Sequence, residues 1–149
     1  MRPQLNPAPR RANATRIDEI LDVPAALRPI YESIEQSRSM QDLEDGWDGE
    51  GSCGYAPETW ERARRFLWDN ALSLWTRDGI AAPAPGVMIG PDGSIDIYWD
   101  LPHSSLLLNV PDVASEAANY YGTREDGAEI KGSLDTSGCH EWLMKWLAR

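Results

Sequence analysis

The spacing of apolar residues changes from a helical period to a strand period in the middle of the chain, which limits the folds that this sequence can adopt. From residue 57 to residue 78, apolar side chains recur every three to four positions, as in one long amphipathic helix. Pro57 suits the first turn of that helix, and Asp78-Gly79 predicts its end. The apolar stripe comprises Trp60, Ala63, Leu67, Ala71, Leu74 and Trp75.

After the proline-containing segment 81–85 the apolar period falls to two, which predicts consecutive strands. We expect these strands at 87–89, 94–99, 105–110, 117–122 and 128–134. Asp92-Gly93 lies between the first two and is typical of a tight hairpin turn. In the second strand, alternation places Ile95, Ile97 and Trp99 on one face and Asp96, Tyr98 and Asp100 on the other.

Helical patterns bracket the strands. A short turn over 17–21, a helix from Pro24 to about Met40 and a C-terminal helix over 139–148 are expected, the last with a cap from Asp135, Thr136 or Ser137. The order predicts an α+β fold, in which N-terminal, middle and C-terminal helices pack on one face of an antiparallel sheet of about four to five strands. Four tryptophans are expected to be structural: Trp47, Trp60, Trp99 and Trp142.

The charge is distributed unevenly. The net charge is −10, but residues 1–16 hold four arginines and no acid, which leaves −14 on the other 133 residues. We expect a disordered Pro/Arg-rich tail over 1–16 and a single acidic domain over 17–149. An acidic domain repels nucleic acid and anionic membrane and attracts basic proteins. The alternative is that the acidity serves only solubility.

The chain is expected to be cytoplasmic and to need no cofactor. Its two cysteines lie 86 positions apart without a CxxC motif, which is not a disulfide framework. The first residues lack the apolar segment of a signal peptide, and no stretch approaches the roughly 20 apolar residues of a membrane span.

A glycine-rich acidic segment, 43–55, joins the first two helices and must form a structured loop. Asp45, Asp48 and Glu50 could supply oxygen ligands to Ca²⁺ or Mg²⁺, although their spacing does not match an EF-hand. Alternatively, Trp47 plugs the loop into the core and Asp48 serves turn formation. Partner recognition is a third interpretation.

This loop also carries a resemblance. The string Gly46-Trp-Asp-Gly-Glu-Gly-Ser52, a helix that begins at Pro57 and the segment Pro91-Asp-Gly-Ser-Ile-Asp-Ile-Tyr-Trp99 occur together. Over roughly residues 41–134, the chain resembles a loose group of small bacterial and phage proteins with a Trp-Asp-Gly-x-Gly loop, a helix and a hairpin. That group has no assigned activity, so the resemblance implies the fold and a mobile-element setting.

No residue pattern indicates a named chemistry. The soft ligands and neutral-pH bases are Cys53, Cys139, His103 and His140, and they lack the paired spacing of a zinc site. Adjacent residues of a helix point about 100° apart, so His140 is poorly placed to activate Cys139. Asp96, Asp100 and Asp112 could form a carboxylate pair for acid–base chemistry, but solvated strand positions explain them equally well.

The leading hypothesis is therefore a non-catalytic module that binds a basic protein or nucleic-acid-binding complex. An antitoxin-like or phage counter-defence inhibitor that imitates nucleic-acid charge is one such module. Candidate partner-binding residues are Asp96, Tyr98, Asp100 and Tyr121, because tyrosine is favoured in interface cores. If helices cover both faces of the sheet, Tyr98 is a core residue instead. A metal-dependent enzyme or module built on the 45–50 loop is the alternative, and a homodimer through exposed aromatic residues is a third possibility.

Overall fold

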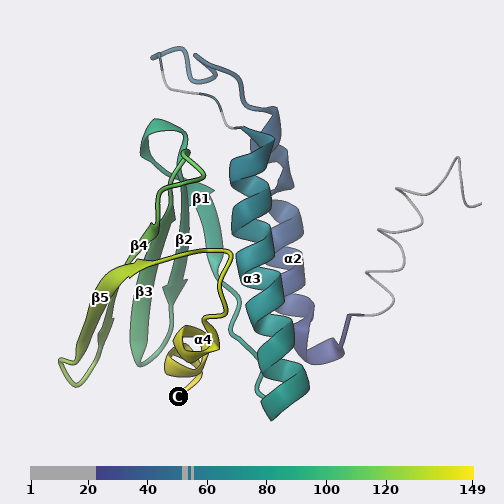
Figure 1. The fold of residues 1–149 in the computed structure, drawn as a ribbon, viewed down its shortest axis with the longest axis vertical. Helices are drawn as coiled ribbons and strands as arrows, with labels where there is room; N and C mark the ends of the chain where they lie inside the picture. Colours follow the sequence, from purple (N-terminus) through teal and green to yellow (C-terminus); the bar gives the residue numbers. More distant parts are fainter. Residues whose placement is uncertain (1–22, 52–53, 55) are drawn as a thin grey trace, which may run out of the picture.

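The computed structural model describes residues 23–51, 54 and 56–149, and it folds them into three α-helices and five strands (Figure 1). The expected tail and the turn over 17–21 lie outside the described residues. The elements in chain order are η1 (Ala25–Leu27), α2 (Arg28–Gln36), η2 (Arg38–Asp42), α3 (Pro57–Asp78), β1 (Gly86–Ile89), η3 (Pro91–Gly93), β2 (Ile95–Asp100), β3 (Ser104–Val110), β4 (Ala118–Arg124), β5 (Glu129–Leu134) and α4 (Glu141–Ala148).

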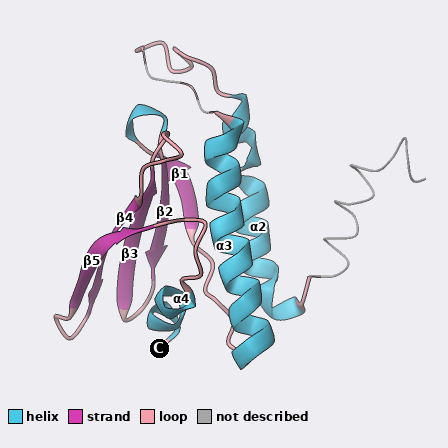
Figure 2. Ribbon diagram, in the orientation of Figure 1, coloured by secondary structure: helices cyan, strands magenta, loops and turns pink. Residues whose placement is uncertain are grey.

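The five strands form one antiparallel sheet in the order β1-β2-β3-β4-β5 (Figure 2), which confirms the α+β class. The β1–β2 connection is the tight turn that Asp92-Gly93 predicts. Asp92 and Gly93 have φ angles of 55° and 79°, and the Ser94 amide donates to Pro91 O at 3.0 Å. Two successive left-handed residues match the right-handed twist of the flanking strands.

The long middle helix is confirmed. It runs from Pro57 to Asp78, and Gly79 ends it with a φ of 65° while its amide donates to Trp75 O. Glycine adopts this left-handed conformation without the steric cost that a Cβ atom adds. Trp60 on this helix is almost fully buried, and its indole N–H donates to Ser37 Oγ at 2.9 Å, which ties α3 to the N-terminal helical segment.

The prediction of one continuous helix from Pro24 to Met40 is wrong, because the segment breaks into η1, α2 and η2. Pro29 lies in the first turn of α2. The backbone N–H groups of a first turn have no partner within the helix, so a proline there costs no helical hydrogen bond. At the other end, Ser37 Oγ donates back to Ile34 O at 2.7 Å, which favours termination there.

One face of the sheet belongs to the hydrophobic core. Ile95, Ile97 and Trp99 on β2 are fully buried and lie opposite buried residues of β3. Trp99 donates its indole N–H to Pro83 O at 2.8 Å, so its polar atom is satisfied inside the core. Buried residues of α3 and α4 belong to the same core cluster, and both helices contact the sheet.

Two glycines make room for aromatic side chains on this buried face. A Cβ atom on Gly122 would lie 2.8 Å from Leu106 Cδ1 and 3.1 Å from the Trp146 ring. A Cβ atom on Gly132 would lie 2.8 Å from the Tyr120 hydroxyl. The missing side chains therefore let α4 approach the sheet closely.

The C-terminal helix begins at Glu141, two residues later than expected, and Trp142, which was expected to be structural, is not part of the buried core. Leu143, Met144 and Leu147 are buried, whereas Trp142 is 45% exposed. The ring of Trp142 packs edge-on against Tyr120 with centroids 5.7 Å apart, so one side of the indole remains in solvent. Met144 takes the buried position because it, not Trp142, shares a face with Leu143 and Leu147.

The expected cap of this helix is also wrong. Asp135 accepts hydrogen bonds from the amide and hydroxyl of Ser137 in a local turn, at 2.9 and 2.8 Å. Instead, α3 supplies an acceptor, since the His140 amide donates to Asn70 Oδ1 at 2.7 Å. A tertiary contact therefore replaces local capping chemistry at the start of α4.

We predict that Gly122→Ala lowers the free energy of unfolding by about 1–3 kcal/mol, because the added methyl group overpacks the α4–sheet contact. Gly86→Ala is the matched control on another strand, where the only atom near the new Cβ is Tyr98 O at 3.8 Å. This control should be neutral or slightly stabilising. Urea unfolding measures both, and equal midpoints for the two variants would contradict the packing at Gly122.

Candidate binding surface

The sheet face opposite the core carries a row of exposed apolar side chains. Tyr98 on β2, Leu107 on β3 and Tyr121 on β4 are 37%, 39% and 47% exposed. Tyr98 lies in register with Leu107, and Leu107 with Tyr121. Side chains at directly opposed positions on one face lie about 4.5–5.5 Å apart at Cβ. We call these three residues the Tyr98 row and this side of the sheet the open face.

Three carboxylates accompany this row on the open face, and neutral donors hold two of them. Asn109 Nδ2 donates to Asp96 Oδ1 at 2.8 Å and to Ser94 Oγ at 2.9 Å. Tyr121 donates its hydroxyl hydrogen to Glu129 Oε1 at 2.9 Å. Asp100 is the third, two residues beyond Tyr98 on the same strand. The hydrogen bonds from Asn109 and Tyr121 orient the carboxylates but do not neutralise them.

The contact with Glu129 raises the pKa of Tyr121, mainly because the hydroxyl is the hydrogen-bond donor and secondarily through desolvation and charge repulsion. Tyr121 therefore stays a neutral donor at physiological pH. The row therefore keeps its apolar and uncharged character.

Several acids on the helices, in contrast, are paired with bases. On α2 and α3, Arg38 pairs with Glu35 at 2.7 Å and Arg64 with Glu61 at 2.5 Å. The α3–α4 contact adds two further pairs, Arg77–Glu141 at 3.0 Å and Lys145–Asp78 at 2.9 Å. Within the described residues, none of the three open-face carboxylates has such a partner. Lys131, in register with Tyr121, adds a positive charge to the same face.

The structure thus brings all four candidate partner-binding residues to one exposed face of the sheet: Asp96, Tyr98, Asp100 and Tyr121. Tyr98 is an exposed residue and not a core residue. Sequence reasoning missed Leu107, Asn109 and Glu129. The alternating pattern of 105–110 could have indicated Leu107, since the hairpin register places it between the two tyrosines.

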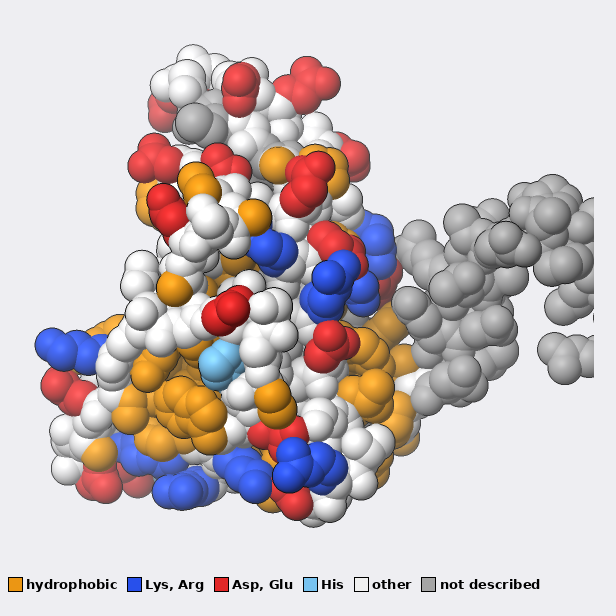
Figure 3. Space-filling model, viewed as in Figure 1, with side chains coloured by type: hydrophobic (Ala, Val, Ile, Leu, Met, Phe, Trp, Pro, Cys, Tyr) orange, Lys and Arg blue, Asp and Glu red, His pale blue; other side chains and the backbone are white. Residues whose placement is uncertain are grey.

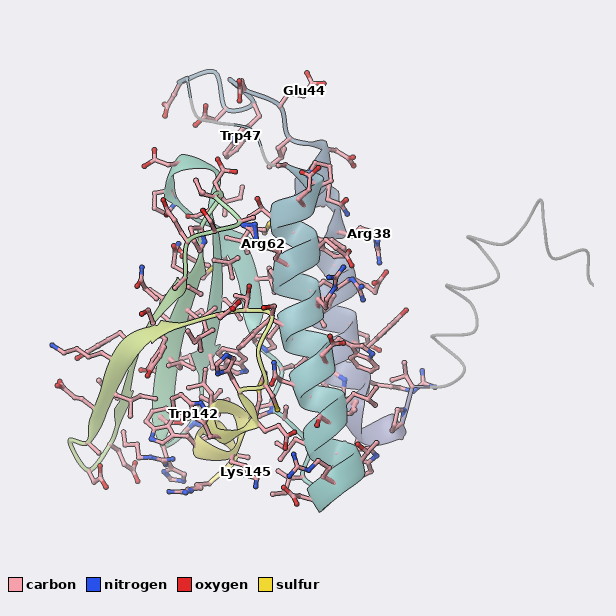
Figure 4. The ribbon with its side chains drawn as sticks, viewed as in Figure 1. Arg38, Glu44, Trp47, Arg62, Trp142 and Lys145 are labelled. Atoms are coloured by element: carbon pink, nitrogen blue, oxygen red, sulfur yellow. The ribbon has the colours of Figure 1, made fainter. Side chains whose placement is uncertain are left out.

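Trp47 of the glycine-rich loop is not inserted into the hydrophobic core, contrary to one of the interpretations above. Trp47 is 38% exposed, and Figure 4 shows it on the loop at the upper end of the molecule, beyond the start of α3. The loop extends past the beginning of α3, where the core ends (Figure 1). Leu43, at the start of the loop, packs partly against the core instead.

The acids proposed as metal ligands form turns in this loop. Asp45 Oδ1 accepts the Gly54 amide at 2.8 Å, and Asp48 Oδ1 accepts the Glu50 amide at 2.9 Å. In the part of the chain that the structure describes, no three His, Cys, Asp or Glu residues are grouped as metal ligands. The turn interpretation of Asp48 accounts for its observed contact.

Three acidic segments meet at one end of the molecule. A Cβ atom on Gly93 would lie 3.3 Å from Gly54 O and 3.4 Å from the Asp112 carboxylate. The glycine-rich loop, the β1–β2 turn and the β3–β4 loop are therefore neighbours. Segments 41–51, 90–94 and 111–117 contain five, one and two acids and no lysine or arginine. Acidic side chains accordingly gather at the upper end of the molecule in Figure 3, away from most basic ones.

The candidate thiol and imidazole groups make separate structural contacts. Cys139 Sγ donates to Glu141 Oε2 at 3.4 Å, and His140 Nε2 lies 2.7 Å from Asp135 O. His103 in the β2–β3 connection pairs with Glu125 in the β4–β5 connection at 2.9 Å. Cys53 lies outside the described residues. Asp112 belongs to the β3–β4 loop and does not share the open face with Asp96.

Glu141 connects α4 to α3 through side-chain contacts. Its carboxylate is almost entirely buried and accepts hydrogen bonds from Ser73 Oγ and Arg77 Nη1. The Ser73 hydroxyl is the main cause that lowers the pKa of Glu141 below its ordinary value of 4.5, and the Arg77 charge adds to it. The carboxylate therefore has a structural role at the junction of the two helices.

Within the described residues, no helix is both long and apolar enough to span a bilayer. Comparison of the chain with protein families, curated proteins and solved structures gave no match.

We predict that Trp47→Ala costs about 1–2 kcal/mol of unfolding free energy, because its side chain is 38% exposed and lies outside the buried core cluster. Trp60→Ala is the matched control, since that indole is 1% exposed and should cost about 3–5 kcal/mol. Urea unfolding distinguishes the two. A loss at position 47 as large as that at position 60 would show that the loop tryptophan is a core residue.

A second prediction concerns pH. Because folding lowers the pKa of Glu141, the ionised carboxylate stabilises the fold above about pH 4.5, and this stability is lost as the pH falls through the lowered pKa. Glu141→Gln should therefore have a lower urea midpoint than the wild type at pH 7. The gap should narrow as the pH falls from 4.5 to 3.

Glu32→Gln, on the exposed side of α2, is the control for a lost charge and should show a small, nearly constant gap. A gap at Glu141 that does not change with pH would contradict the role assigned to its carboxylate.

Proposed function

We propose that this chain is a non-catalytic binding module that docks on a basic protein surface through the open face of its sheet. One observation carries the proposal: an exposed row of Tyr98, Leu107 and Tyr121 is accompanied by carboxylates that are held in place but unpaired with a base. Large apolar side chains grouped on a surface mark interaction sites more often than chance exposure does.

The row supplies the apolar part of such an interface. Tyrosine is enriched in interface cores because it buries a large area with little loss of side-chain entropy. Side chains on strands are also held more rigidly than those on loops, so less entropy is lost on binding. The open face therefore offers an ordered, amphipathic contact surface.

The charges select the partner. The open face holds three carboxylates and one lysine, Lys131, and the whole chain has a net charge of −10. Two copies packed face to face would oppose six carboxylates with two lysines, which disfavours a homodimer through this face. Nucleic acid is repelled for the same reason. A basic protein surface is complementary to it.

The acidic end of the molecule assists this selection. The eight carboxylates of the three neighbouring segments create a negative field that extends over about one Debye length, roughly 8–10 Å at physiological salt. Such a field increases the rate at which a basic partner arrives. Contacts with the Tyr98 row then determine the dissociation rate of the complex.

The partner class is inferred from this charge pattern, and the expected resemblance of the string at residues 46–52 to bacterial and phage proteins agrees with it. Proteins that bind nucleic acid present basic surfaces, and an acidic domain can occupy such a surface in place of the phosphate backbone. The chain is thus proposed to act as a cytoplasmic inhibitor of a nucleic-acid-binding protein or complex, as an antitoxin or a counter-defence protein does. No cofactor is needed for this activity.

The test is capture of a partner from a lysate of the source organism at low salt, followed by elution in a salt gradient and comparison of matched variants. Tyr98→Ser combined with Tyr121→Ser should reduce recovery of the partner at least tenfold, because the apolar contact is lost. Trp142→Ser is the control, since Trp142 is equally exposed but lies on the other side of the sheet.

The charge variants are Asp96→Asn with Asp100→Asn, and the control is Glu32→Gln with Asp69→Asn, two exposed acids outside the open face and the acidic segments. Both pairs remove two charges, but only the first pair lies on the open face. The first should elute at a clearly lower salt concentration. Equal elution of all variants, or a captured partner without a basic surface, would contradict the proposal. Urea unfolding confirms that each variant is folded.

A further inference from the structure

We infer that the open face receives an arginine side chain of the partner beside Tyr98, between Asp96 and Asp100. The inference rests on the proposed function, since it concerns the same face, and it names the chemical group that the face recognises. Three features of the described residues support it: the space beside the Tyr98 ring, the position of the two carboxylates and the geometry of guanidinium contacts.

The β1 position directly opposite Tyr98 carries no side chain. Gly86 is the residue in register with Tyr98 on β1, whereas Leu107 fills the corresponding position on β3. A Cβ atom built on Gly86 would meet only Tyr98 O, at 3.8 Å. A planar group can therefore approach the Tyr98 ring above Gly86, while Met88 lies two residues further along β1, opposite Asp96.

Two carboxylates flank this position along the strand. Asp96 and Asp100 lie two residues before and after Tyr98, so each is about 6.6 Å away along β2 and on the same face. Asn109 contacts Oδ1 of Asp96, which leaves the second oxygen to accept a hydrogen bond from a ligand. A cation over Tyr98 is thus within reach of an acceptor on either side.

Arginine fits this arrangement better than lysine. A guanidinium is flat, stacks on an aromatic ring and retains N–H donors at its edges for carboxylates. An ammonium group is compact and more strongly hydrated, so it loses more on leaving water. The chain itself uses this contact twice, because Arg38 lies 4.6 Å above the Trp60 ring and Arg124 lies 4.4 Å above the Trp146 ring.

The experiment uses two synthetic peptides of equal charge, acetyl-(Gly-Arg-Ser)₃-amide and acetyl-(Gly-Lys-Ser)₃-amide, titrated into the full-length protein at low salt. Backbone amide NMR shifts give the site and the dissociation constant. We expect the arginine peptide to shift amides of 95–100, Gly86 and Leu107, and to bind about five-fold more tightly than the lysine peptide.

Two variants make the test specific. Gly86→Leu adds a side chain beside Tyr98 and should abolish the preference for arginine without lowering the urea midpoint, because the new Cβ atom has only Tyr98 O nearby, at 3.8 Å. Ser133→Leu adds the same side chain to an exposed position of β5 on the open face and should retain the preference.

Equal affinity for the two peptides, shifts confined to the acidic segment 42–50, or no shift of the β2 amides at millimolar arginine peptide would overturn the inference. Its failure is distinguishable from that of the proposed function. If arginine preference is absent but partner capture still depends on Tyr98 and Tyr121, only the arginine site is rejected. If the preference is present but capture ignores both tyrosines, the proposed function is rejected.

Discussion

The structure depends on the different environments of the two faces of its sheet. Ile95, Ile97 and Trp99 contribute one face of β2 to the same hydrophobic core as α3 and α4. Each buried Leu, Ile or Phe side chain contributes roughly 1.5–3 kcal/mol through the removal of apolar surface from water. Because strand residues alternate, this burial also fixes the register, and the register brings Tyr98, Leu107 and Tyr121 together on the other face.

Charged side chains are also arranged differently on the helices and on the open face of the sheet. Ion pairs of the described residues reinforce the helices and the α3–α4 contact, where Glu141 and Asp78 meet Arg77 and Lys145 (Figure 4 labels Lys145). The open face has carboxylates but no such pairs, and the acidic loops gather at one end (Figure 3). Removal of two carboxylates from the open face should therefore change binding more than stability.

The elements with strong local signals could be predicted from the sequence. The helix from Pro57 to Asp78 has a proline at its start and a glycine after its end, and the strands have a clear alternation and an Asp92-Gly93 turn. Tertiary contacts determined what the sequence pattern did not show. Asn70 replaces the local cap of α4, and Met144 takes the buried position expected of Trp142. The glycine-rich loop extends past the upper end of α3, and Trp47 on it is partly exposed and not a member of the core.

The candidate surface was only half predictable for a similar reason. Composition and alternation indicated Asp96, Tyr98 and Asp100, because all three belong to one strand. Their relation to Leu107, Asn109 and Glu129 depends on strand order and register, which join residues far apart in the chain. The acidic end likewise arises from three segments that only the fold brings together.

The most direct test of the central claim is hydroxyl-radical footprinting of the chain, free and in complex with its captured partner. In the free protein, Tyr98, Tyr121 and Trp142 should all be oxidised, since each is more than a third exposed. In the complex, Tyr98 and Tyr121 should be protected while Trp142 is still oxidised. Unchanged oxidation of both tyrosines, with protection of Trp142 or Trp47 instead, would show that the partner binds elsewhere and that the open face is not the binding surface.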